Sequence, residues 1–393
     1  MRRTLAVFAV IAVLATAALA LIGWPARAYR DSDWMQYYAG SSAVLAGASP
    51  WDLSWWRAFH ADAGSIVLTG PPHTGDPASD WTTPYPLWTF LMLVPFALAP
   101  LWLAAPLFAV SQIFVLLFAA WLFARRAIAV RAVPLAIVLI AFAQPVWSLT
   151  AGGNVTGFAA AAFTVALWAA LRGRPGLAGL LLVGTLLKPH LFVLGIVALV
   201  ASVPPSARRR LIGSAAVGAL AIILPSFILQ PGWVAPWLTA VTHLQTTSLS
   251  NATGWTIARP FTNDFVPWSA AAVVLGLVAF AWWCYRVRPS ALSLIAAALP
   301  VSIFIAPHGW TYDYVVLVPT AIVAVGVASA AHRRLAALVA AAALISVVPW
   351  ALNVVAFARN GEELSAFVLI VAALGAFAFP SVQPRAAPAA GTS

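Results

Sequence analysis

The sequence predicts an all-α polytopic membrane protein, and this prediction rests on composition and on the pattern of apolar runs. Apolar residues make up 63% of the 393 positions and charged residues only 8%, which leaves too few polar side chains to cover a soluble globule of this size. Apolar runs long enough for helices that cross a bilayer recur along the chain, and the basic residues fall between them. We therefore expect about 12 membrane crossings.

The positive charge of the chain follows the same pattern. A formal net charge of +11 would suggest a nucleic-acid partner in a soluble chain, but short arginine clusters between apolar runs are typical of the positive-inside rule. We therefore expect membrane lipids as partners and no nucleic acid. The clusters, all predicted to be cytoplasmic, are Arg2 and Arg3, Arg125 with Arg126 and Arg131, Arg172 and Arg174, Arg208 to Arg210, Arg286 and Arg288, Arg333 and Arg334, and Arg385.

Prolines predict where two of the apolar runs break. Residues 177–203 should form two short helices that turn at Lys188-Pro189, because proline interrupts a helix and frees backbone carbonyls. This places Lys188 toward the outer side of the membrane. Residues 87–124 are too long for one straight helix. Their three prolines predict one broken span preceded by a partly inserted helix.

The first outer loop, residues 25–86, is the most polar part of the chain and follows the first apolar span directly. Six of the ten acidic residues lie in it, so some of them are expected to serve a function at the membrane surface. Within the loop, residues 49–60 read as a capped amphipathic helix whose tryptophans suit the water-lipid interface. Residues 1–383 are expected to form a single domain, and residues 384–393 a disordered tail.

Several kinds of site are not expected. The single cysteine, Cys284, excludes an intramolecular disulfide. No His-x-x-x-His or Cys-x-x-Cys spacing is present, which argues against a metal. The sequence also lacks the glycine-rich loops that cradle nucleotide phosphates, so we expect no cofactor.

Five short motifs follow one another along the chain. They are Asp33-Trp-x-x-Tyr37-Tyr38 with the Ala-Leu-Gly-Pro-Trp pattern at 43–51, Thr83-Pro84-Tyr85-Pro86-Leu87, Gly153-Asn154, Leu187-Lys188-Pro189-His190 and Pro307-His308-Gly-Trp310-x-Tyr312-Asp313. Together, and in this order, they resemble glycosyltransferase family 87, and the first of them is similar to the family's first outer loop. The chain departs from the family pattern at Trp34, where Phe is usual, and at a single proline in place of Pro-Pro.

The resemblance implies a GT-C-type bundle of transmembrane helices whose long first outer loop carries interfacial helices. It also implies an enzyme of the cell membrane that works on the extracytoplasmic side. Its reaction would transfer a hexose, most simply mannose by an α-1,2-mannosyltransferase activity, from a polyprenyl-phosphate sugar to a lipid-linked or cell-envelope glycan acceptor, with inversion. The competing hypothesis is a transporter or flippase of lipid-linked sugars. Transporters tend to carry ionisable groups at the bilayer midplane and internal repeats, and neither is evident here.

The resemblance makes Asp33 the candidate catalytic base. A lipid-phosphate sugar brings its own leaving group, so the enzyme needs a base for the acceptor hydroxyl and positive charge around the phosphate. Asp33 could instead cap the helix that begins near Trp34. Asp31 is the reserve candidate, although it can equally be a solvated loop carboxylate or a neighbour that tunes Asp33.

Three basic residues are candidates for binding the donor phosphate or sugar. Lys188 is costly inside a membrane-embedded segment unless a phosphate or carboxylate offsets its charge, but it can also snorkel to the interface. His308 can bond to phosphate or sugar, or be an ordinary interfacial histidine. Arg259 can bind two phosphate oxygens, or be an ordinary loop arginine. The weaker candidates for the pocket are Tyr37, Tyr38, Asn154, His243 and Asp313.

Overall fold

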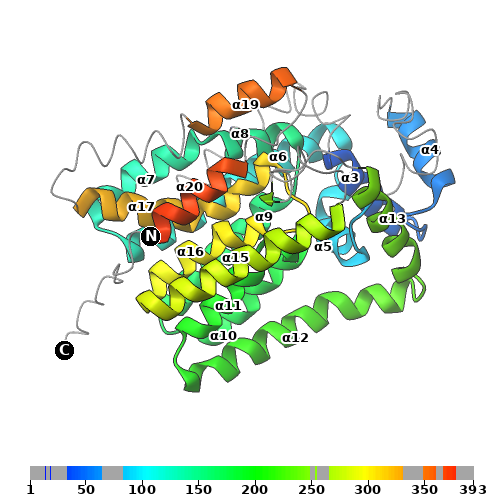
Figure 1. The fold of residues 1–393 in the computed structure, drawn as a ribbon. Coiled ribbons are helices and arrows are strands. Elements are labelled where there is room, and N and C mark those ends of the chain that lie inside the picture. The colour runs from blue at the N-terminus through cyan, green and yellow to red at the C-terminus, as the bar shows by residue number, and fades with distance from the viewer. Residues whose placement is uncertain are drawn as a thin grey trace. The chain divides into compact units, whose positions relative to one another are not determined.

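The computed structural model describes residues 14, 18, 33–63, 83–247, 253, 254, 265–330, 348–359 and 366–377, and every regular element in these residues is helical. The predicted all-α class is therefore confirmed. The helices (Figure 1) are α3 (Asp33–Leu45), α4 (Leu53–Ala63), α5 (Leu87–Ala97), α6 (Leu101–Ala127), η3 (Val130–Ala132), α7 (Val133–Ala141), α8 (Gln144–Gly152), α9 (Thr156–Leu171), α10 (Pro175–Leu182), η4 (Val183–Leu187), η5 (Pro189–Leu191), α11 (Val193–Ser202), α12 (Pro205–Leu229), α13 (Val234–Thr247), α15 (Phe265–Val287), α16 (Ala291–Phe304), η7 (Thr311–Leu317), α17 (Val318–Ala330), α19 (Val348–Arg359) and α20 (Ala366–Phe377).

Within the described residues, three stretches of helix are long and apolar enough to cross a membrane. They are Leu101–Ala127, Pro205–Leu229 and Thr311–Ala330, and a fourth span arises if α7 and α8, bent by 43°, count as one. Shorter apolar helices such as α9 and α16 accompany them. The chain is therefore a helical membrane protein. The count of about 12 crossings stays a prediction, and the helix expected before residue 33 lies almost entirely outside the described residues.

The long apolar run after the first outer loop breaks once. Helix α5 ends at Ala97 and α6 runs from Leu101 to Ala127. The expected short helix before the span is therefore present, but the span itself is continuous and not broken as predicted. Of the three prolines, only Pro100 lies at the break. Pro95 and Pro106 lie inside α5 and α6, so the prediction that they interrupt the run was wrong. Each proline removes a single backbone donor, a loss that a helix packed against its neighbours can absorb.

The predicted turn at Lys188 is confirmed. Helix α10 tightens into the 3₁₀ helix η4, and Lys188 follows with φ −148° and ψ 68°, outside helical geometry. The next 3₁₀ turn, η5, begins at Pro189 and leads into α11. Because the helical ladder stops at Lys188, its side chain is presented at a break between two short helices.

Helix α4 confirms the capped helix expected in the first outer loop, but it begins at Leu53. Asp52 provides the cap: its Oδ1 accepts from the Ser54 amide at 2.8 Å and from the Ser54 hydroxyl at 2.7 Å. These hydrogen bonds hold the pKa of Asp52 below its ordinary value. One of the six carboxylates of the loop therefore has a structural task.

The chain divides into two compact units. Unit 1 comprises residues 1–115, 149–155 and 216–249, and unit 2 comprises residues 116–148, 156–215 and 250–393. The expectation of a single domain over residues 1–383 stays a prediction. The tail at 384–393 lies outside the described residues.

Unit 1 is built around aromatic side chains. Helix α3 packs on α5 so closely that a Cβ on Gly40 would lie 2.3 Å from the Phe90 ring, so only glycine fits this contact. Two indoles hold the segment before α5, because Trp51 donates to the Thr83 carbonyl at 3.0 Å and Trp237 to the Pro84 carbonyl at 2.9 Å. These bonds fix the backbone immediately before Tyr85.

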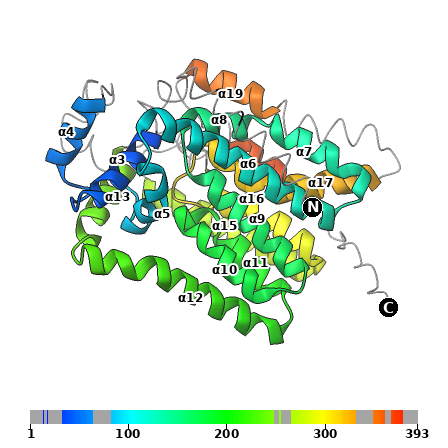
Figure 2. The same cartoon turned by 180° about the vertical axis from the view of Figure 1, so that it is seen from behind.

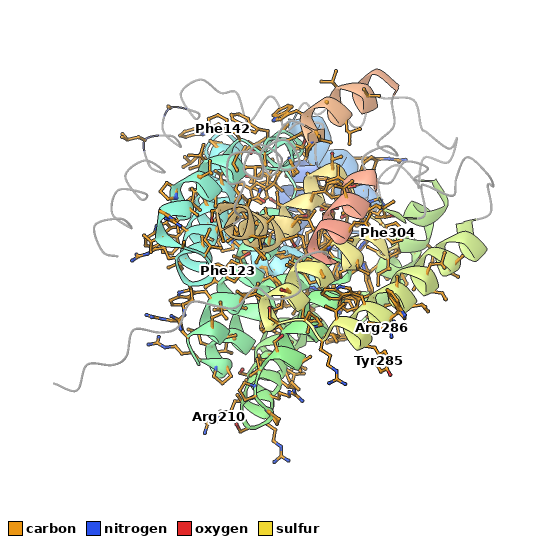
Figure 3. The ribbon with its side chains drawn as sticks, turned by 60° about the vertical axis from the view of Figure 1, so that its left-hand side comes forward. Phe123, Phe142, Arg210, Tyr285, Arg286 and Phe304 are labelled. Atoms are coloured by element: carbon orange, nitrogen blue, oxygen red, sulfur yellow. The ribbon has the colours of Figure 1, made fainter. Side chains whose placement is uncertain are left out.

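Unit 2 packs α9 against α10 and η7, and α16 against α11 and α20. Helices α9, α10, α11 and α16 can be followed in Figure 2. Small residues allow these close approaches, as is common between membrane helices. A Cβ on Gly195 of α11 would lie 2.7 Å from a methyl group of Leu299 on α16. Figure 3 shows Arg210 and Arg286 at the same end of unit 2, with Phe142 toward the opposite end. Two of the predicted cytoplasmic clusters thus share one end.

Candidate active site

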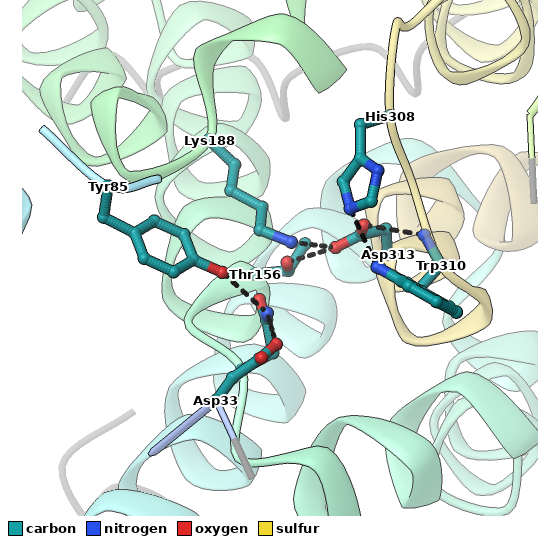
Figure 4. Close-up of polar contacts among 8 residues, drawn as sticks. Asp33, Tyr85, Thr156, Lys188, His308, Trp310 and Asp313 are labelled. Carbon is teal, nitrogen blue, oxygen red and sulfur yellow. Dashed lines mark hydrogen bonds and ion pairs between the residues drawn. The ribbon is translucent and has the colours of Figure 1, made fainter. Parts of the chain in front are cut away.

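Asp33 is the first residue of α3 and is half-buried (Figure 4). Its position in the first helical turn favours a negative charge, because unpaired backbone N–H groups and the helix dipole face it. The side-chain amide of Asn154 donates to Oδ2 of Asp33 at 2.5 Å. The structure therefore brings the candidate base together with one of the predicted pocket residues, 121 positions away in the sequence.

Asn154 is fully buried and is placed by a turn at the end of α8. The residue after that helix, Gly153, has φ 62°, a left-handed conformation that glycine adopts without strain. The Nδ2 atom of Asn154 also lies 3.5 Å from the hydroxyl of Tyr85. One amide thus links Asp33 to the segment that precedes α5.

Tyr37 completes this group, which we call the base cluster (Asp33, Tyr37, Tyr85 and Asn154). The ring centroids of Tyr37 and Tyr85 are 4.6 Å apart. Burial first, and then Tyr85 and the charge of Asp33, raise the pKa of Tyr37 well above its ordinary value. Its hydroxyl therefore stays protonated at neutral pH, and the only carboxylate of the cluster is Asp33. Tyr38 has a different task, because its hydroxyl donates to the Ala99 carbonyl at 2.8 Å.

In unit 2, Lys188 is buried and paired with Asp313. The Nζ atom lies 2.8 Å from Oδ1, and the two side chains are 5% and 0% exposed. The same Nζ lies 5.0 Å from the centroid of the Tyr312 ring. Lys188 is therefore held inside the protein by a carboxylate that the sequence had ranked only as a weak pocket candidate.

The carboxylate of Asp313 accepts further hydrogen bonds. The Thr156 hydroxyl donates to Oδ1, and the Trp310 amide donates to Oδ2 at 3.0 Å. The Asp313 amide returns a bond to the Trp310 carbonyl at 2.9 Å, which fixes the start of η7. A buried carboxylate with this many partners is stable as an anion, so it can hold the Lys188 ammonium in one place.

His308 lies in the loop between α16 and η7. The indole N–H of Trp310 donates to Nε2 of His308 at 2.8 Å, so the imidazole accepts at this nitrogen. Burial first, and then the positive charge of Lys188, lower the pKa of His308 to about 4. The ring is therefore neutral at pH 7, and its proton lies on Nδ1, where it can be donated. We call Thr156, Lys188, His308, Trp310 and Asp313 the cation cluster.

Several residues that build these clusters do not stand out in the sequence as site residues. Tyr85 and Trp310 are recognisable there only as parts of motifs, and Thr156 carries no signal of its own, although it follows Gly153-Asn154 closely. The signal that could have ranked Asp313 higher was its setting, since a carboxylate inside an apolar helix needs a partner of opposite charge. Lys188 is such a partner.

Three predicted residues cannot be placed in either cluster. Asp31 and Arg259 lie outside the described residues, and so does the side chain of His243, whose backbone belongs to α13. Among the residues that the structure describes, no group of three or more His, Cys, Asp or Glu could hold a metal ion. The expected absence of a cofactor remains a prediction.

The profile of glycosyltransferase family 87 matches residues 81–310, which is more than half of the 393-residue chain. The chain belongs to glycosyltransferase family 87. The matched region contains Tyr85, Asn154, Lys188 and His308, whereas Asp33 lies before it. No curated protein and no solved structure matches the chain. Family 87 membership confirms the resemblance inferred from the motifs and supports glycosyl transfer as the chemistry.

Proposed function

We propose that this family 87 protein transfers mannose from a polyprenyl-phosphate donor to a lipid-linked or cell-envelope glycan acceptor, with inversion at the anomeric carbon. The observation that carries the proposal is a buried ammonium at a helix break in a glycosyltransferase with membrane-spanning helices. A membrane enzyme suits a sugar donor that is itself anchored by a lipid. The family supports transfer, and no observation favours the transporter alternative.

The proposed reaction is a single displacement. The acceptor hydroxyl oxygen attacks the anomeric carbon, its proton passes to the Asp33 carboxylate, and the bond between that carbon and the phosphate oxygen breaks. Polyprenyl phosphate leaves with the bonding electrons. Asn154 acts as a positioning residue, because the hydrogen bond from its side-chain amide to Oδ2 of Asp33 orients the carboxylate.

The cation cluster is the proposed site of the donor phosphate. An ammonium has three N–H donors, and Asp313 takes one at 2.8 Å, so Lys188 keeps donors for phosphate oxygens. The neutral His308 adds its Nδ1–H. Charge developing on the leaving phosphate is stabilised most when such donors are already in place. Arg259 is the third phosphate ligand that we propose.

A transfer assay tests the proposed donor directly. Purified protein is incubated with polyprenyl phosphates carrying radiolabelled mannose, glucose or galactose, together with a membrane lipid extract. We expect label from the mannose donor to move to a lipid or glycan acceptor. If only the glucose or the galactose donor transfers its label, mannose is not the transferred sugar. If none of the three donors transfers label to an acceptor although the protein is folded and pure, the proposal of a polyprenyl-phosphate sugar donor is wrong.

Orientation in the membrane is the second prediction that the proposal needs. In a variant without Cys284, single cysteines at Gly75, Asn251 and Gly361 should react with an impermeant thiol reagent added to intact cells. A cysteine at Arg209 should react only after the membrane is opened, because the basic clusters predict that it is cytoplasmic. External labelling at position 209 would overturn the extracytoplasmic assignment.

A further inference from the structure

His190 is a half-buried polar residue for which the proposed reaction has no role. It lies in η5, immediately after the break at Lys188. Its ring donates a hydrogen bond to the backbone carbonyl of His308. Its Nε2 atom is buried and has no hydrogen-bond partner in the part of the chain that the structure describes. The donor to the carbonyl is therefore Nδ1.

The free nitrogen of His190 is an acceptor. A neutral imidazole carries one N–H and one lone pair, and the N–H is already used by the His308 carbonyl. Burial first, and then the charge of Lys188, lower the pKa of His190 to about 4, so the ring does not take up a second proton at pH 7. A buried acceptor without a partner is unfavourable, so this nitrogen is suited to a ligand group that brings its own hydrogen.

Among the groups of the proposed donor, only a hydroxyl can donate a hydrogen bond to Nε2 of His190. Phosphate oxygens offer lone pairs and would be repelled by Nε2, and a prenyl chain offers no polar hydrogen. A hexose carries several hydroxyl donors, and it is joined directly to the phosphate assigned to Lys188 and His308. The imidazole lies close to the surface, since His190 is only half-buried and Pro189 is exposed.

Building on the proposed donor, we infer that Nε2 of His190 accepts a hydrogen bond from a hydroxyl of the donor sugar. His190 is then a specificity residue: it recognises the sugar, whereas the cation cluster recognises the phosphate. A second source of the same chemistry is a hydroxyl of the acceptor glycan. The two sources are separated by measuring donor binding without acceptor.

The test compares two probes, farnesyl phosphate and farnesyl-phosphate mannose, bound to purified protein without acceptor. His190→Phe keeps a planar ring but has no acceptor, so it should weaken binding of the mannosyl probe by roughly 5- to 50-fold. Binding of farnesyl phosphate should fall much less, because its site loses only the bond from His190 to the His308 carbonyl. His190→Gln places an amide oxygen near the lost nitrogen and should regain most of the affinity. The double variant Lys188→Met/Asp313→Asn should instead weaken both probes.

Each other result overturns the assignment. Equal weakening of both probes by His190→Phe would make the residue structural, and unchanged binding of the mannosyl probe would remove its role in the sugar site. Normal mannosyl binding with a raised KM for the acceptor would assign the hydroxyl to the acceptor. If the parent binds farnesyl phosphate but not its mannosyl form, mannose is the wrong sugar. If it binds neither, the polyprenyl-phosphate donor itself fails.

Discussion

We expect Asp33→Asn to lower the rate of glycosyl transfer by roughly 100- to 10,000-fold and to leave donor binding largely unchanged. The amide keeps the shape of the carboxylate, and its oxygen can still accept the bond from Asn154 that the parent makes at 2.5 Å. What it loses is the ability to take a proton from the acceptor hydroxyl. The effect should therefore appear in kcat and leave the donor dissociation constant almost unchanged.

The matched control for Asp33 is Asp52→Asn. Asp52 lies in the same polar loop, but it is an exposed helix cap, and asparagine caps helices as well as aspartate does. Its transfer rate should stay near that of the parent. Asp31→Asn should also have a small effect. If Asp31→Asn abolishes transfer and Asp33→Asn does not, the base is Asp31; if both variants stay active, Asp33 is only the start of α3.

The second large effect concerns the buried ion pair. Lys188→Met leaves the carboxylate of Asp313 buried without its cation, and breaking such a pair costs about 3–5 kcal/mol of stability. We expect a large fall in the thermal unfolding midpoint in detergent. A loss of donor binding in this variant would therefore not separate a phosphate-binding role from a structural one.

The double variant Lys188→Met/Asp313→Asn separates the two roles. It removes both charges, and neutral replacement of a buried ion pair is commonly tolerated, so much of the lost thermal stability should return. Donor affinity should remain low, because the charge-assisted contact to phosphate is still missing. Recovery of both stability and donor affinity would show that Lys188 serves the fold and does not bind phosphate.

Sequence alone determined the membrane class, the helix break at Lys188 and the motifs of the family. These follow from local physical chemistry: a chain with 8% charged residues cannot form a soluble surface of this size, and proline cannot continue a helical ladder. The same local argument failed at Pro95 and Pro106, which lie inside helices. Packing against neighbouring helices outweighs the loss of one backbone bond there.

Only the tertiary structure decided which side chains meet. Asp313 lies 125 positions from Lys188, and no spacing rule connects a 3₁₀ turn with a distant helix break. The same holds for the amide of Asn154 on Asp33. The sequence also could not predict that Nε2 of His190 has no hydrogen-bond partner among the described residues. Whether a buried nitrogen has a partner depends on every side chain around it. Sequence fixes which groups a chain carries, and packing fixes which of them are left for a substrate.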